Sequence, residues 1–421
     1  MFEQELAKVR QLVTEQEEWR SRCLNLIASE QVMSRFARSL MGSDFCHRYA
    51  EGHPGERYYQ GTDKIDEIEV ELKKELKQLF HCQHTEVRPI SGTVANEAVF
   101  SRYINYGDIV ISNSTPGGGH ISHQKTGSVG KYTRNVLSFP RAADGYHIDV
   151  GKTKSLIRQT RPSTIVFGKS LFLFPEPIRE LHDVCGRYNV HIVYDGAHVL
   201  GLIAGGQFQQ PLEEGAELIT ASTHKTFPGP QRGLIISNLD WRQWREIDQG
   251  AFPGSSSNHH LDTLAPMLAA TYEMRAFGRE YAAQIVANAK RLAETMHKLG
   301  LDVEAAEFGY TASHQVAVNM ARWGGGNEVS RKLRQSDIIL NMNLLPGEPL
   351  KNHDNPSGAR IGVQEMTHVG MKEQEMDEIA QLIAACLMDD KNVRDDVHKL
   401  RAKFQDVKYS FDDVKKPPPA G

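Results

Sequence analysis

The chain has 421 residues, more than one compact core usually holds, so two domains are expected. Hydrophobic residues make up 40% and charged residues 24%, and the net charge of −4 gives no reason to expect nucleic-acid or membrane partners. The five scattered cysteines form no CxxC pair, which favours reduced thiols in a cytoplasmic protein over a disulfide framework or a metal site. The charged N-terminus and the lack of an apolar run near ~18 residues predict neither a secretion signal nor a membrane span.

The first segment, 1–20, has apolar residues at roughly helical spacing and predicts an amphipathic helix. Such a helix either packs on the surface of its own chain or covers a second subunit. The apolar run 24–28 follows it and ends at Ser29, which lies either at the surface or at a site.

Residues 47–61 combine glycines and a proline with three tyrosines, so we expect a loop without regular structure. A loop dense in Tyr, Arg and Glu more often binds a ligand than packs, although an aromatic cluster that closes the loop is the alternative. The segment 63–80 has one apolar stripe at helical spacing and predicts a helix.

Two segments of the first half carry groups suited to a flat, phosphorylated ligand. Ser91, Gly92 and Thr93 precede the predicted helix 94–103, where free N–H groups and the helix dipole attract an anion, although a plain N-cap is the alternative. A buried strand, 108–112, leads to three glycines and His120, whose ring either stacks on an aromatic ligand or is structural.

Two further buried strands, 164–170 and 190–194, flank a predicted helix at 178–188, which indicates a parallel sheet with right-handed crossovers. Ligands of such sheets bind at the carboxyl ends of the strands. Asp195 follows the second strand, where it either pairs with a pyridinium nitrogen or starts an ordinary turn.

Lys225 lies between the apolar runs 217–221 and 233–237, in a turn that Pro228, Gly229 and Pro230 impose. Burial lowers the pKa of a lysine, and its neutral amine forms a Schiff base with an aldehyde such as pyridoxal phosphate (PLP). A lysine whose ammonium group lies in water is the alternative.

The C-terminal half begins with the polar loop 252–260 and a long helix, 261–299, which we expect to break near Gly278. Arg360 stands among small residues, where its guanidinium either binds a carboxylate through two hydrogen bonds or lies at the surface. The other predicted elements are strands at 314–321 and 338–343, a turn into a short strand within 355–362, and helices at 327–336 and 372–389.

Six motifs together resemble the serine hydroxymethyltransferase family, and the resemblance runs from about residue 15 to residue 390. They are Leu26-Ile-Ala-Ser-Glu30, the segment from Arg48 to Tyr59, Ser91-Gly-Thr-Val-Ala-Asn96, Gly118-Gly-His120, Thr223-His-Lys-Thr226 and Gly358-Ala-Arg-Ile-Gly362. The runs 194–204 and 257–260 look most like the archaeal branch of that family.

The resemblance implies the α/β fold of a fold-type I PLP-dependent transferase. A large domain with a mostly parallel seven-stranded sheet between helices would be joined to a smaller C-terminal α/β domain. The expected divisions are an N-terminal arm (1–45), the large PLP-binding domain (46–280), the small domain (281–405) and a disordered tail (406–421). The implied activity is interconversion of serine and glycine, with the one-carbon unit passed to a reduced pterin, either tetrahydrofolate or tetrahydromethanopterin.

The resemblance also implies roles for individual residues. The catalytic residues would be Lys225, which holds PLP covalently, Glu51, His120, Asp195 and Tyr59. The cofactor contacts would come from Ser91, Gly92, Thr93, His120, Ser170, Asp195, His198, Ser222, His224, Lys225, Tyr49 and Gly254. The amino acid would be bound by Ser29, Glu51, Tyr59 and Arg360, and no metal is implied.

Tyr49, Tyr59 and the loop 252–260 would reach the site from a neighbouring subunit, which implies a homodimer, and pairing of dimers into a tetramer stays open. The chain departs from the family pattern at Gln31, at 227–232 and at 255–260. The alternative function is therefore a pterin-independent aldolase or transaldolase that acts on threonine, other β-hydroxy amino acids or α-methylserine. A non-catalytic PLP binder and an aminotransferase are further alternatives.

Overall fold

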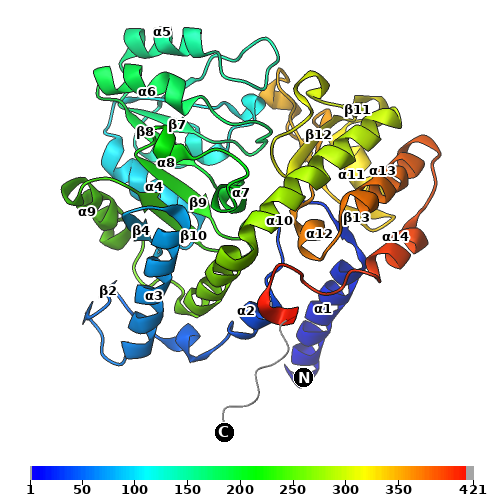
Figure 1. Ribbon diagram of the computed structural model, residues 1–421, viewed down its shortest axis with the longest axis horizontal. Coiled ribbons are helices and arrows are strands. Elements are labelled where there is room, and N and C mark those ends of the chain that lie inside the picture. The colour runs from blue at the N-terminus through cyan, green and yellow to red at the C-terminus, as the bar shows by residue number, and fades with distance from the viewer. Residues whose placement is uncertain (1, 414–421) are drawn as a thin grey trace.

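The computed structural model describes residues 2–413 (Figure 1). Its main sheet has seven strands in the order β4-β10-β9-β8-β7-β5-β6. All of the strands from β5 to β9 run parallel, and only β10 runs antiparallel to its neighbours, which confirms the predicted mostly parallel sheet. The strands are β4 (His84–Glu86), β5 (Ile109–Ser112), β6 (Asn135–Ser138), β7 (Thr164–Phe167), β8 (His191–Asp195), β9 (Leu218–Ser222) and β10 (Gly233–Ser237).

Helices cover both faces of this sheet because successive side chains of a strand point to opposite faces. Val110, Val166 and Val193 pack on one face against α4 (Gly92–Tyr103) and α9 (Trp241–Gln249). Their neighbours along the strands face the other, larger core. The helices of that core include α3 (Asp63–Phe80), α5 (Val150–Thr160), α6 (Ile178–Arg187), α7 (Leu200–Ala204) and α8 (Pro211–Glu214).

A single helix, α10 (Leu264–Lys298), runs from the main sheet to the C-terminal half of the molecule (Figure 1). It contacts α3 and α7 beside the main sheet and α13 (Glu373–Met388) in the other half. The predicted break near Gly278 is wrong, because α10 continues through this position as one helix, and the glycine that the close packing here requires is Gly205. A Cβ atom built on Gly205, at the end of α7, would lie 2.4 Å from the carbonyl oxygen of Gly278.

The second sheet has four antiparallel strands in the order β11-β12-β15-β14. The predicted strand 338–343 is wrong as one element. It divides at Leu340, because its first part pairs with β1 (Leu24–Asn25) and its second part pairs with β15. The elements of this half are β11 (Asp302–Val303), β12 (Gln315–Asn319), β13 (Ile338–Ile339), β14 (Asn341–Asn343), β15 (Gly358–Gly362), α11 (Gly326–Arg334), α12 (Gln364–His368) and α14 (Arg394–Arg401).

The N-terminal helix α1 (Phe2–Arg22) forms as predicted and packs beside α14 only near its end. Trp19 anchors it by donating a hydrogen bond of 2.8 Å from Nε1 to Asp337 Oδ1. The apolar side chains earlier in the helix, however, are not covered by any of residues 2–413. Leu6 is 69% exposed and Val9 is 59% exposed, so the helix leaves an apolar face open to a partner.

Two short segments differ from expectation. The loop 47–61 contains a minimal hairpin, in which β2 (Gly52–His53) pairs with β3 (Glu56–Arg57), so the expected lack of regular structure is wrong. Gly52 and Gly55 make the hairpin possible with φ values of 97° and 79°, which other residues rarely adopt. A short helix, α2 (Arg35–Ser39), precedes this loop.

Residues 406–413, from the tail expected to be disordered, include a 3₁₀ turn at Phe411–Asp413, and the ring of Phe411 lies 5.2 Å from that of Phe277 on α10. Residues 414–421 lie outside the described residues. The domain boundaries at 45, 280 and 405 stay predictions. Within residues 2–413, the apolar length that a bilayer crossing demands is found in none of the helices.

Candidate active site

The turn that carries Lys225 is held from both sides. Thr223 Oγ1 donates a hydrogen bond of 2.6 Å to the carbonyl oxygen of Pro230, and the N–H of Gly229 donates back to the carbonyl of Thr223. Thr226 Oγ1 donates to the carbonyl of His198 at 2.8 Å, and both threonines are fully buried. The lysine therefore leaves the end of β9 in one defined direction.

Lys225 lines a cavity of about 260 Å³ at the carboxyl ends of the parallel strands. Burial lowers the pKa of its amine to about 8, although the negative charge of Asp195 acts in the opposite direction. No carboxylate among the described residues makes an ion pair with its Nζ. The cavity is lined by Ser91, Gly92, Thr93, Asn96, His120, His123, Lys169, Asp195, Ala197, His198, Ser222, His224, Lys225 and Gln231.

Asp195, at the end of β8, is buried and its carboxylate is fully engaged. Its Oδ2 accepts hydrogen bonds from Asn96 Nδ2 at 2.7 Å and from His123 Nε2 at 2.8 Å. Its Oδ1 accepts from the N–H of Ala197 at 3.0 Å. Burial alone would raise the pKa of this carboxyl, but His123, His120 and Asn96 together outweigh burial and hold the pKa well below its usual range. The structure thus places a stable negative charge at the cavity wall.

The start of α4 forms the opposite end of the cavity. Ser91 is the N-cap of this helix, and its Oγ accepts a hydrogen bond from the N–H of Val94 at 3.2 Å. Elsewhere in residues 2–413, nothing accepts a hydrogen bond from the N–H groups of Gly92 and Thr93. A Cβ atom at Gly92 would lie 2.3 Å from Ser222 Oγ, so any larger residue there would displace the Ser222 hydroxyl. The two N–H groups and the helix dipole make a site for an anion.

His120 and His198 are neutral rings at the cavity. Burial lowers the pKa of His120 to about 4, and burial also holds the pKa of His198 well below its usual range. Gln315 Nε2 can only donate, so His198 Nδ1 accepts from it at 3.0 Å and the proton of His198 sits on Nε2. His198 therefore offers a hydrogen-bond donor from its other nitrogen.

Arg360, on β15, lines a second cavity of about 340 Å³ that shares His120, His198 and Lys225 with the first. Its side chain is buried, and its Nη1 donates to the carbonyl of Ser170 at 2.6 Å. Burial lowers the pKa of this guanidinium to about 10. Within residues 2–413 the Arg360 guanidinium has no carboxylate partner, so this buried cation can pair with a negatively charged ligand. Ser29 and Ser170 also line this cavity.

Four predicted site residues are not brought to these cavities by their own chain. Tyr49, Glu51, Tyr59 and Gly254 are all described, and none of them lines either cavity around Lys225. Tyr49 and Tyr59 are 44% and 43% exposed, and their rings lie 5.0 Å apart, edge to face. Glu51 lies near enough to Tyr59 to form a side-chain hydrogen bond, and the pKa of Tyr59 is raised, first by burial and then by this negative charge.

Sequence reasoning missed two groups that hold Asp195. His123 comes three residues after His120, and Asn96 ends the motif that begins at Ser91, yet neither was assigned a role. Thr220 Oγ1 donates to Asn96 Oδ1, which leaves Asn96 Nδ2 free to donate to Asp195. Gln231, within a segment that departs from the family pattern, also lines the first cavity.

The donor set fits PLP. The unpaired N–H groups at Gly92 and Thr93 suit a phosphate, and Asp195 suits a protonated ring nitrogen. The buried Nδ1 of His224, beside Lys225, has no hydrogen-bond partner among residues 2–413. Because His224 lines the cavity, this nitrogen can form a hydrogen bond with a polar group of the ligand. Lys225 supplies the amine that the aldehyde of PLP requires.

Comparison with known proteins agrees with this geometry. The family model described as serine hydroxymethyltransferase matches residues 2–383. The chain is 45% identical over 406 residues to the serine hydroxymethyltransferase of Methanosphaera stadtmanae, with 96% of each chain covered. It is 47% identical over 412 residues to the enzyme of the same name from Pyrococcus abyssi, again with 96% of each chain covered.

A solved structure of L-threonine transaldolase from Pseudomonas fluorescens, in its internal aldimine state, is also similar. Its TM-score is 0.89 at 28% sequence identity, and the match covers 99% of this chain and 96% of that one. The family model and the archaeal relatives span nearly the whole chain, with the cavities included. The protein is thus a fold-type I, PLP-dependent enzyme, and it belongs to the serine hydroxymethyltransferase family.

Proposed function

We propose that this enzyme interconverts serine and glycine and passes the hydroxymethyl carbon of serine to a reduced pterin, tetrahydrofolate or tetrahydromethanopterin. The observation that carries the proposal is the buried Arg360, whose guanidinium faces the cavity it shares with Lys225. Archaeal relatives with this name, matched over nearly the full chain, support the reaction class.

PLP, once bound, supplies an electron sink for the bond that breaks at Cα of the amino acid. Lys225 provides the amine that holds it, and its lowered pKa of about 8 keeps a useful fraction of that amine neutral. The Asp195 carboxylate would keep a proton on the ring nitrogen of PLP, and His198 would donate from Nε2 to its phenolic oxygen. His120 would cover one face of the ring.

The phosphate of PLP would lie at the start of α4. The N–H groups of Gly92 and Thr93 point toward this end of the cavity, and Ser91, Ser222 and His224 add polar side chains. Gly92 keeps the approach open, since a Cβ atom there would collide with Ser222. These contacts fix the position of the ring without taking part in the chemistry.

Arg360 would bind the carboxylate of the amino acid, with Ser29 and Ser170 beside it. Asn341 Oδ1 lies 3.3 Å from Arg360 Nη2 and 3.4 Å from Nε, so it orients the planar group. A carboxylate would give the buried cation its missing partner, which fixes Cα over the cofactor.

Glu51 would serve as the acid–base group at the hydroxymethyl carbon, with Tyr59 beside it, and Tyr49 and Gly254 would contact the cofactor. Because their own chain keeps them away from its cavities, we infer that they act in the neighbouring subunit of a homodimer. Asn258 supports this inference: it accepts from the N–H of Ala50 at 3.1 Å and donates to the carbonyl of Arg48 at 2.9 Å, so the two loops form one unit.

The exposed apolar face of α1 supports the same assembly, since a second subunit would bury it. Sedimentation of the purified protein would distinguish a dimer from a tetramer. The divisions at residues 45, 280 and 405 remain our proposal for its domains. A cytoplasmic location is also our proposal, which all five free cysteines support.

The function is tested by absorbance. Glycine is added to the PLP-loaded protein alone, then with tetrahydrofolate, and then with tetrahydromethanopterin. We expect a visible absorbance band that rises sharply with one of the two pterins, which would identify the carrier. A spectrum that neither pterin changes would contradict carrier-dependent transfer.

A carrier-independent aldolase or transaldolase is the second candidate. One observation favours it, the similarity to the L-threonine transaldolase structure. This candidate predicts fast turnover of threonine or α-methylserine without any pterin. Steady-state assays with each amino acid, with and without carrier, separate the two.

A further inference from the structure

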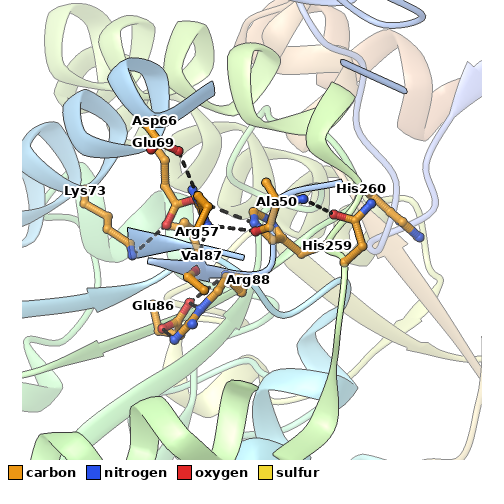
Figure 2. Close-up of polar contacts among 12 residues, drawn as sticks. Ala50, Arg57, Asp66, Glu69, Lys73, Glu86, Val87, Arg88, His259 and His260 are labelled. Atoms are coloured by element: carbon orange, nitrogen blue, oxygen red, sulfur yellow. Dashed lines mark hydrogen bonds and ion pairs between the residues drawn. The ribbon is translucent and has the colours of Figure 1, made fainter. Parts of the chain in front are cut away.

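One guanidinium binds the backbone on both sides of Glu51. Arg57 Nη1 donates to the carbonyl oxygen of Ala50 at 2.8 Å and to that of Gly52 at 2.7 Å. Figure 2 shows the Arg57 side chain between Ala50 and Glu69. Because the two carbonyls flank residue 51, this contact sets the direction in which the Glu51 side chain leaves the backbone.

The other donors of Arg57 are bound to helix α3. Its Nε donates to Asp66 Oδ1 at 2.8 Å, and its Nη2 donates to Glu69 Oε2 at 2.6 Å. The side chains of Arg57 and Glu69 are 2% and 0% exposed, so this pair is shielded from water. The planar guanidinium thus makes four hydrogen bonds, two to the loop backbone and two to carboxylates of α3. Together they hold the loop rigidly to the helix.

Glu69 also lies near the second loop. His259 Nε2 lies 3.7 Å from Glu69 Oε2, and Lys73 Nζ lies 2.8 Å from Oε1 (Figure 2). Arg232 Nη2 can only donate, so His259 Nδ1 must accept from it and the His259 proton sits on Nε2, toward Glu69. The loop 252–260 thus lies beside this carboxylate without a hydrogen bond to it, and Asn258 joins that loop to the loop 47–61.

This carboxylate keeps its charge. Burial raises the pKa of Glu69, but Lys73, His259 and Arg57 outweigh burial and lower the pKa to about 2. The anchor therefore stays ionised throughout the pH range in which the enzyme can be assayed. A buried charge with these partners is costly to disturb, because removing one partner leaves the others unpaired.

We propose that Arg57 is a positioning residue for Glu51, and that Glu69 anchors Arg57 to α3. The inference rests on the proposed function, in which Glu51 is the acid–base group. Arg57 touches neither substrate nor cofactor. It acts by holding the backbone of Glu51 at a fixed distance from α3.

The test is the Arg57→Lys variant of the PLP-loaded enzyme. Lysine keeps the positive charge, but its single nitrogen cannot bind two carbonyls and two carboxylates at once. We expect kcat for serine cleavage to fall about 10-fold to 100-fold, since a small misplacement of a catalytic group has an effect of that size. The KM for serine and the bound PLP should stay within about threefold, because Arg360 and Lys225 are untouched.

A double variant separates positioning from general damage. If Arg57 acts through Glu51, then Glu51→Gln and the pair Glu51→Gln, Arg57→Lys should have the same kcat. Independent losses that multiply in the double variant would overturn the inference. The control is Arg291→Lys, which breaks the bidentate pair with Asp377 at 2.7 and 2.6 Å, far from both loops, and should leave kcat unchanged.

If Arg57→Lys does not fold, Asn258→Ala provides the second variant. This variant removes the hydrogen bond to the N–H of Ala50 and leaves the buried pair of Arg57 and Glu69 intact. The inference is supported if Asn258→Ala lowers kcat in the otherwise wild-type enzyme and does not lower kcat further in the Glu51→Gln variant. Suppose that Glu51→Gln lowers kcat but Arg57→Lys does not. That result would overturn the inference about Arg57 and leave the proposed function standing. Unchanged kcat in Glu51→Gln itself would instead overturn the role that the proposed function gives Glu51.

Discussion

His123 Nε2 lies 2.8 Å from Asp195 Oδ2, with the imidazole fully buried between α4 and the end of β8. Asn96 donates to the same oxygen, so two side chains hold one carboxylate at the cavity wall. Both donors favour the ionised form of Asp195 and keep its pKa below the usual range. The negative charge is therefore in place before any ligand arrives.

The charge of Asp195 can be removed with little change of shape. Asp195→Asn should lower kcat for serine cleavage by at least about 100-fold, because an amide cannot keep a proton on the ring nitrogen. Stopped-flow or steady-state assays would measure the loss, with the PLP content followed by absorbance. Asp240→Asn, at the N-cap of α9, is the surface control. Activity of the Asp195 variant close to that of the control would contradict the assigned role.

The lowered pKa of Lys225 predicts a pH dependence of cofactor uptake. Its amine is half neutral at a pH of about 8, whereas an ordinary lysine reaches that point near pH ~10.4. Only the neutral amine attacks the aldehyde, so the rate of PLP uptake by the apoenzyme should rise with pH and level off above about 9. Absorbance after mixing would give the rate. A rate that continues to climb toward pH ~10.4 would contradict the lowered pKa.

Arg360 should distinguish a carboxylate from a neutral group. Arg360→Gln should raise the KM for serine by about 100-fold or more, because the variant loses a charge-assisted double hydrogen bond. The KM for L-serinamide should change by less than about tenfold, since it has no carboxylate to lose. Parallel kinetics with both substrates test this prediction. Equal losses for acid and amide would show that Arg360 supports the cavity without binding the carboxylate.

The shared site predicts complementation between two inactive variants. Lys225→Ala and Glu51→Gln subunits, co-expressed with different tags, should form hybrid dimers with one intact site each. We expect about a quarter of the wild-type activity in the mixture, because about half of the dimers are hybrids and half of their sites are intact. Activity no higher than that of the separate variants would place Glu51 and Lys225 in the same chain.

The strands that the sequence pattern predicted are those with continuous apolar character, because strands buried on both faces leave that signature. The element β6 was missed since Asn135–Ser138 is an edge strand with exposed ends, and α5 was missed since only Ile157 and Thr153 in it are buried. The long helix α10 was found, but its glycine was wrongly interpreted as a break.

The site was predictable where a side chain follows a strand or begins a helix. Asp195, Lys225 and Ser91 were found by their place at element ends, and the structure brings them to one cavity. His123 and Asn96 were not assigned, because their role depends on Asp195, which lies 72 and 99 residues away. Glu51 lines neither cavity around Lys225 of its own chain, so its proposed action in a neighbouring subunit stays a prediction.

Transfer of the hydroxymethyl carbon to a pterin can be followed by NMR with serine that carries an isotopic label at Cβ. With the correct reduced pterin, we predict that the label moves to the pterin while one glycine forms for each serine consumed. Without a pterin, the label should stay in serine. Rapid release or transfer of the label without any pterin, unaffected when tetrahydrofolate or tetrahydromethanopterin is added, would contradict the account and establish the carrier-independent reaction instead.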